Sequence, residues 1–140
     1  GAALADLVGD VSAEDAAARP IPGAHTIWEL VLHVTAWTEI ARQRLASATK
    51  PPDPTDADDW PAVRDTSPER WRSAVERLKD AHRELADDVA GVADDSLSGR
   101  LPGRDHSATT MLHGIVEHAA YHGGQIALLK RALSRTSSTP

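Results

Sequence analysis

The chain has 140 residues, a formal net charge of −6 and no cysteine. This length suits one domain that buries about two-thirds of the surface of its unfolded chain. Without cysteine the chain has no disulfide framework, no cysteine metal site and no thiol nucleophile of its own. It has no apolar run long enough for a membrane span and no cluster of Lys and Arg, which nucleic-acid binding needs. The first ten residues also lack the segments of a signal peptide. We therefore predict a single cytoplasmic domain over residues 1–140 whose partner is a small-molecule substrate, not a nucleic acid or a membrane.

The first predicted elements are two short helical segments, Ala2 to Val8 and Ser12 to Ala18. A long helix follows from Thr26 to about Thr49 and ends before the Pro51-Pro52 pair. Its start, TIWE, fits a capping box in which the Thr side chain caps the helix and the Glu reaches back. Apolar residues then recur on one helical face, at Ile27, Leu30, Val31, Val34, Trp37 and Leu45.

The next segment, from Lys50 to Thr66, reads as a Pro-rich loop that carries Trp60. Its acidic run, Asp53 to Asp59, predicts a solvated loop. Ser67-Pro68-Glu69 then predicts the start of a second long helix, with an N-cap, a proline in the first turn and an early acid. Its bundle seam has alternating spacings of four and three at Trp71, Val75, Leu78, His82, Leu85, Val89 and Val92.

The third long helix is predicted from about Ala108 to Leu133, after the loop SLSGRLPGRDHS. Its basic end suits a helix C-terminus. Strand signals are lacking throughout the chain. The sequence therefore predicts an all-α bundle.

Two histidines of this third helix, His118 and His122, lie four residues apart on its apolar stripe. Burying two polar rings without partners costs about 1–3 kcal/mol each. A metal ion resolves this cost, because histidines at this spacing can ligate a single ion. Two buried histidines satisfied by hydrogen bonds are the alternative. The Gly123-Gly124 pair that follows weakens the helix, and it could make room for a close neighbour or a bend.

A third ligand must come from another helix. His33 is the better candidate, because it flanks the apolar stripe of the first long helix and an antiparallel neighbour could face it. His82, at a seam position of the second long helix, is the other candidate, or a group that orients a ligand. His25 and His106 fall in loops.

The segments IWELVLHVTAW and MLHGIVEHAAYHGGQIALL together resemble the DinB/YfiT-like metal-binding superfamily of four-helix bundles. The family pattern has one histidine on the second bundle helix and an H-x3-H pair on the fourth, followed by Gly-Gln. In this sequence those positions are His33, His118, His122, Gly124 and Gln125. The resemblance covers about Val11 to Leu133 and implies an up-down four-helix bundle whose first helix is short or truncated here.

The resemblance also implies a divalent metal on His33, His118 and His122, most often nickel or zinc, with manganese or iron as further options. Some members are thiol-dependent transferases that use bacillithiol, mycothiol or glutathione, and the family is commonly dimeric. We therefore expect a metal-dependent thiol S-transferase that forms a homodimer. Candidates for groups that orient the ligands or line the pocket are Trp37, Gln125, His82 and Tyr121.

Two other functions use the same ligands. A metal-dependent hydrolase would need a general base, and no Asp or Glu shares the histidine stripe, which disfavours this reading slightly. A non-catalytic module would use the site to bind a metal or small molecule, or to brace the bundle. We assign no catalytic residue beyond the metal ligands.

Overall fold

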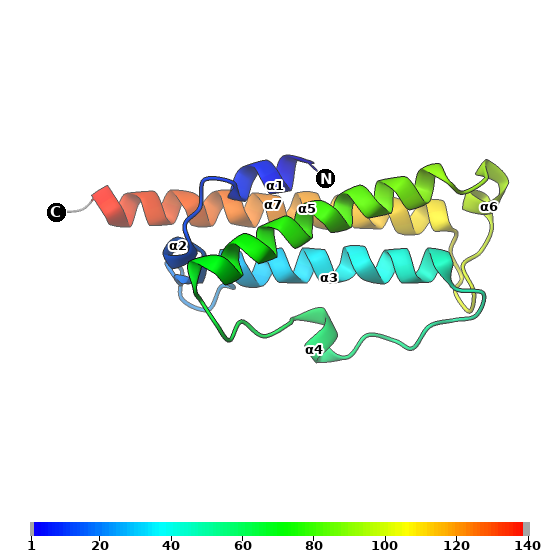
Figure 1. Cartoon of the computed structure of the whole chain (residues 1–140), viewed down its shortest axis with the longest axis horizontal. Coiled ribbons are helices and arrows are strands. Elements are labelled where there is room, and N and C mark those ends of the chain that lie inside the picture. The colour runs from blue at the N-terminus through cyan, green and yellow to red at the C-terminus, as the bar shows by residue number, and fades with distance from the viewer. Residues whose placement is uncertain (1, 139–140) are drawn as a thin grey trace.

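The computed structural model describes residues 2–138, with side chains described over 4–135 (Figure 1). In this part of the chain it contains seven helices and no strand: α1 (Ala2–Val8), α2 (Ala13–Ala17), α3 (Ile27–Ala46), α4 (Asp56–Asp59), α5 (Pro68–Ala90), α6 (Asp94–Ser98) and α7 (Ala108–Ser138). The predicted all-α class is confirmed. None of the helices within the described residues is long and apolar enough to cross a membrane.

The predicted helix starts rest on the expected side-chain caps. Thr26 Oγ1 accepts a hydrogen bond from the backbone N–H of Glu29 at 3.0 Å, and Glu29 Oε1 accepts from the Thr26 N–H at 2.9 Å. Ser67 Oγ accepts from the N–H of Arg70 at 3.3 Å, and Pro68 occupies the first turn of α5. Each cap satisfies a donor that the first turn of a helix leaves unpaired.

The three long helices do not alternate in direction along the chain. The Trp28 and Trp71 rings lie 5.2 Å apart at one end of the α3–α5 pair, and Arg42 pairs with Asp88 at the other. Helices α3 and α5 are therefore parallel, and α7 runs antiparallel to both (Figure 1). Helix α3, about 30 Å long, is followed by a connection over residues 47–67 that returns along the bundle and carries α4. The four-helix order is thus up-down-down-up, a crossover that helical periodicity does not reveal.

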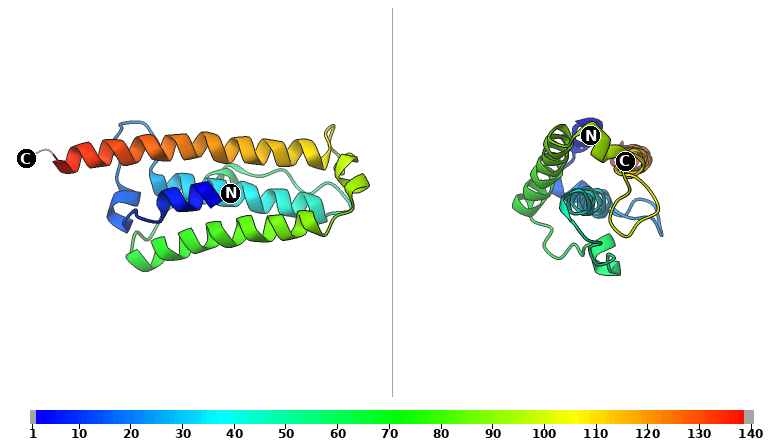
Figure 2. Two further views of the ribbon diagram at one scale, coloured as in Figure 1. Left: turned by 90° about the horizontal axis from the view of Figure 1, so that it is seen from above. Right: turned by 90° about the vertical axis from the view of Figure 1, so that its right-hand side faces the viewer.

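The fourth position in the bundle is filled along part of its length by the short helix α1, which lies beside α5 and α7 (Figure 2). Leu4 and Val8 are buried. A Cβ at Gly123 would lie 3.5 Å from Leu4 Cδ1 and 3.6 Å from Leu7 Cδ1, so this glycine lies against α1. A Cβ at Gly124 would meet nothing within 4 Å, and the packing gives no reason for this second glycine.

The core divides into two clusters along the bundle. The larger cluster joins α1 and α2 to the long helices, and the smaller one lies near the C-terminal ends of α3 and α5. The predicted α5 seam contributes the buried side chains Trp71, Val75, Leu78 and Leu85. Helix α5 ends at Ala90, so the last predicted seam residue, Val92, lies beyond it.

Candidate metal site

Three histidines meet between α3 and α7. Because the two helices are antiparallel, His33 faces the pair His118 and His122. His118 Nε2 lies 2.9 Å from His33 Nε2 and 3.1 Å from His122 Nε2. His33 and His122 are buried and His118 is half-buried. One ligand nitrogen from each residue lies within 4.8 Å of the others, so the cluster could hold a metal ion.

In His33 and His122 the second ring nitrogen, Nδ1, lies away from the centre of the cluster, and its hydrogen bond determines which nitrogen carries the proton. His33 Nδ1 is 2.6 Å from the backbone carbonyl oxygen of Asp59, and His122 Nδ1 is 2.6 Å from Gln125 Oε1. Both oxygens are acceptors, so each Nδ1 carries the proton and each Nε2 presents a lone pair. A neutral His118 can donate at most one proton to two such lone pairs. The centre of the cluster therefore favours a cation.

The nitrogen separations also fit a metal ion. At a metal–nitrogen distance of about 2.1 Å, two ligand nitrogens that form a right angle at the metal lie about 3.0 Å apart. Two nitrogens at the tetrahedral angle lie about 3.4 Å apart. The separations of 2.9 and 3.1 Å that His118 Nε2 makes with His33 Nε2 and His122 Nε2 match those of ligands on one ion. Such a donor set leaves the other coordination positions open, whereas structural zinc sites usually have four protein ligands.

The electrostatics of the cluster keep the rings neutral. Burial, together with the neighbouring His122 and His33, lowers the pKa of His118 to about 4. Burial also lowers the pKa of His33, and the Asp59 carbonyl only partly offsets this effect. Neutral imidazole is the form that ligates a metal. His33 and His118 are therefore ready to bind an ion at neutral pH without first losing a proton.

The lowered pKa of His118 predicts that the metal-free protein loses stability in mild acid. In the unfolded chain His118 has a pKa near 6.5, so between about pH 6.5 and 4 the unfolded state binds the extra proton. The free energy of unfolding must then fall as the pH falls through this range. Urea unfolding at pH 7, 6 and 5 should show a weaker pH dependence for His118→Gln than for the wild type. His113→Gln, at an exposed position of α7, should retain the wild-type dependence, and equal slopes in all three proteins would refute the assignment.

A carboxylate adjoins the cluster, which corrects the prediction for the acidic run. The last residues of this run form α4, which lies against α3 and places Asp59 Oδ1 3.2 Å from His33 Nδ1. The same oxygen accepts a hydrogen bond from Trp37 Nε1 at 2.7 Å. The sequence did not predict this role for Asp59, because helical periodicity relates only residues of the same helix. Its backbone and side chain together orient the His33 ring, as groups behind a metal ligand do.

Trp60, next to α4, covers the cluster. Its ring stacks on His33 with centroids 3.8 Å apart and planes 4° apart, and on His25 with centroids 3.6 Å apart. These two stacks make Trp60 a packing anchor for the His33 ring. The loop histidine His25 thereby supports the site indirectly.

The other candidates lie at different distances from the cluster. Trp37 contacts the His118 ring at a centroid distance of 6.2 Å, and Gln125 holds His122. The ring of Tyr121 lies 5.1 Å from that of His122, although Tyr121 is 66% exposed. His82 is partly buried on α5 and is not one of the three clustered histidines.

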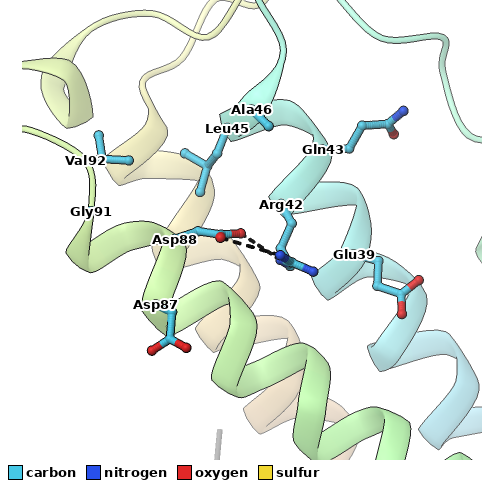
Figure 3. Close-up of a pocket in the computed structure, with 9 residues that line it drawn as sticks. All are labelled: Glu39, Arg42, Gln43, Leu45, Ala46, Asp87, Asp88, Gly91 and Val92. Carbon is cyan, nitrogen blue, oxygen red and sulfur yellow. Dashed lines mark hydrogen bonds and ion pairs between the residues drawn. The ribbon is translucent and has the colours of Figure 1, made fainter.

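Several cavities lie along α3, and two of them differ in their relation to the histidines. One, of about 510 Å³, adjoins the histidines and is lined by His33, Trp37, Arg44, Asp59, His106, Thr110, Met111, Gly114, Ile115 and His118. The other, of about 650 Å³, lies between the C-terminal parts of α3 and α5 (Figure 3). Its arginine, Arg42, donates to Asp88 at 2.7 Å and to Glu84. The second cavity contains none of the clustered histidines, so a metal ion held by them would adjoin the first.

Comparison with known proteins gives one match. The family model described as the DinB superfamily matches residues 1–126, which include all three clustered histidines. No curated protein and no solved structure matches the chain.

Proposed function

The chain belongs to the DinB superfamily, and we propose that it binds one divalent metal ion through His33, His118 and His122. The observation that carries the proposal is the convergence of three Nε2 atoms, with two Nδ1 protons directed to oxygen acceptors. Imidazole ligands suit nickel, zinc and iron, and we propose nickel or zinc as the resident metal.

We further propose a thiol S-transferase activity. A divalent metal bound by three neutral imidazoles keeps its positive charge and can acidify a coordinated thiol to a thiolate. The chain has no cysteine, so the thiol must come from a cosubstrate such as bacillithiol, mycothiol or glutathione. Asp59 and Trp60 fix the His33 ring, and Trp37 forms a wall beside His118. These residues hold the ligands in place and exclude water from one side of the site.

The test is thiol-dependent turnover by the metal-loaded protein, with each thiol offered against a panel of electrophiles. We expect turnover with at least one thiol and at least a hundredfold slower rate in His118→Ala, since loss of a ligand removes the group that activates the thiol. His113→Ala should retain the rate. Thiol-dependent turnover that survives His118→Ala would refute the role of the metal.

The position of Asp59 favours metal-dependent hydrolysis as the second candidate. Its side chain lines the same cavity as His33 and His118 and supplies the carboxylate that a general base requires. Asp59→Asn keeps the shape and removes the charge. It should abolish ester or amide hydrolysis if this candidate is right, and only weaken thiol transfer. A protein that binds metal but turns over no substrate would be a binding module.

Apolar side chains exposed on α7 support the proposal of a homodimer. Val116, Tyr121 and Leu128 are the large apolar side chains most exposed within the described residues, at 65%, 66% and 60%. We propose that a second copy of the chain covers this face in the cytoplasm. Sedimentation should show a dimer that Leu128→Glu dissociates, and a wild-type monomer at micromolar concentration would refute it.

A further inference from the structure

The cavity beside the histidines has a second chemical feature along its length. Arg44 lies eleven positions after His33 on α3, about 16 Å along the helix axis, and both residues line the cavity. The wall between them includes Trp37, Met111 and Ile115. The cavity thus offers a metal-ligating group, an apolar wall and a guanidinium group.

No carboxylate among the described residues forms an ion pair with Arg44. Its Cζ lies 5.7 Å from the centroid of the Trp37 ring, a cation–π contact. Among residues 4–135 its guanidinium forms no hydrogen bond and no ion pair, whereas Arg42 pairs with Asp88 (Figure 3) and also with Glu84. A charged donor with spare hydrogen-bonding capacity at the wall of a cavity is suited to an anion.

The surrounding charged groups do not occupy the hydrogen-bond donors of the Arg44 guanidinium. The carboxylate of Asp53 is shared by Arg104, at 3.2 Å, and Lys50, at 3.6 Å. Burial and the nearby Arg104 lower the pKa of Arg44, and the charge of Asp53 offsets this only in part, so a second guanidinium acts on the same region. Arg104 Nε is itself buried without a hydrogen-bond partner among the described residues.

We propose that this cavity binds a small organic carboxylate, with its apolar body against Trp37 and its carboxylate on Arg44. The histidine end then meets the reactive part of the molecule, and only this last point rests on the proposed function. A monoanion fits better than a phosphate dianion, because Asp59 places a negative charge in the same cavity. The Trp37 ring lies between the two ends, 6.2 Å from the His118 ring and 5.7 Å from Arg44 Cζ.

The test compares two probes of equal shape, 4-phenylbutyrate and 4-phenylbutyramide, by calorimetric titration of the full chain. The wild type should prefer the carboxylate by at least about tenfold, the magnitude of a hydrogen bond to a charged group. Arg44→Gln should bind both probes equally, and Arg44→Lys should retain part of the preference. Arg83→Gln, at an exposed position of α5, should keep the whole preference and serves as the matched control.

The same titrations on His118→Ala separate this inference from the proposed metal site. If the wild type binds no metal but shows a preference that depends on Arg44, the metal proposal fails and the carboxylate site stands. If the preference persists in Arg44→Gln and disappears in His118→Ala, the carboxylate binds at the histidines and the inference is overturned. Equal binding of both probes to the folded wild type also overturns it.

Discussion

His118→Ala is expected to lower the affinity for divalent metal by at least about a hundredfold, more than loss of a group behind a ligand typically costs. The His118 Nε2 atom lies within 3.1 Å of the Nε2 atoms of both His33 and His122, so its removal leaves two ligands on different helices. Elemental analysis of untagged protein, after reconstitution with nickel, zinc or manganese, should find about one ion per wild-type chain and almost none in the variant.

The matched control is His113→Ala, on the same helix and exposed. It should bind as much metal as the wild type, because its ring lies outside the cluster. Equal metal content in His118→Ala and the wild type would place the ion elsewhere. A wild-type protein that binds no metal after reconstitution would make the three histidines structural, and the search for function would move to partner proteins.

Leu78→Ala is expected to destabilise the fold by about 2–5 kcal/mol, the usual cost of a buried leucine truncation. Leu78 has no exposed surface and belongs to the larger core cluster, where the long helices meet. Truncation removes apolar contacts and leaves a cavity that close-packed neighbours fill only in part. Chemical unfolding at pH 7 measures the change as a lower midpoint with an unchanged slope.

Lys79→Ala provides the comparison within α5, since Lys79 is exposed and its only described ion pair is with Glu76 at 3.5 Å. An exposed pair of this kind contributes less than about 1 kcal/mol. If Leu78→Ala costs no more than Lys79→Ala, the assignment of this region as the core is wrong.

The glycine pair shows what helical periodicity alone could and could not predict. The sequence placed both residues directly after the buried His122, and it left open whether they make room for a neighbour. The structure assigns that role to Gly123, which lies against Leu4 and Leu7 of α1. The identity of the neighbouring helix could not be predicted, because the spacing within α7 does not specify which segment packs on it.

The site was predicted in part for the same reason. His118 and His122 follow from the 3.6-residue period, which puts positions four apart on one face whatever surrounds the helix. The position of His33 beside an apolar stripe made it a better candidate than His82, and the family resemblance strengthened that choice. Asp59 and Trp60 reach the cluster only because the segment after α3 returns along it, a path that no local pattern encodes.

The sequence by itself determined the features that depend on neighbours a few residues apart. These are the three long helices, the caps at Thr26 and Ser67, the two short helices before them, and the shared face of two histidines. Only the tertiary structure decided the parallel α3 and α5, the carboxylate behind His33 and the cavity that links the histidines to Arg44. Local backbone and capping interactions act within a turn or two, whereas these features depend on contacts between segments far apart in the chain, which are fixed when the core packs.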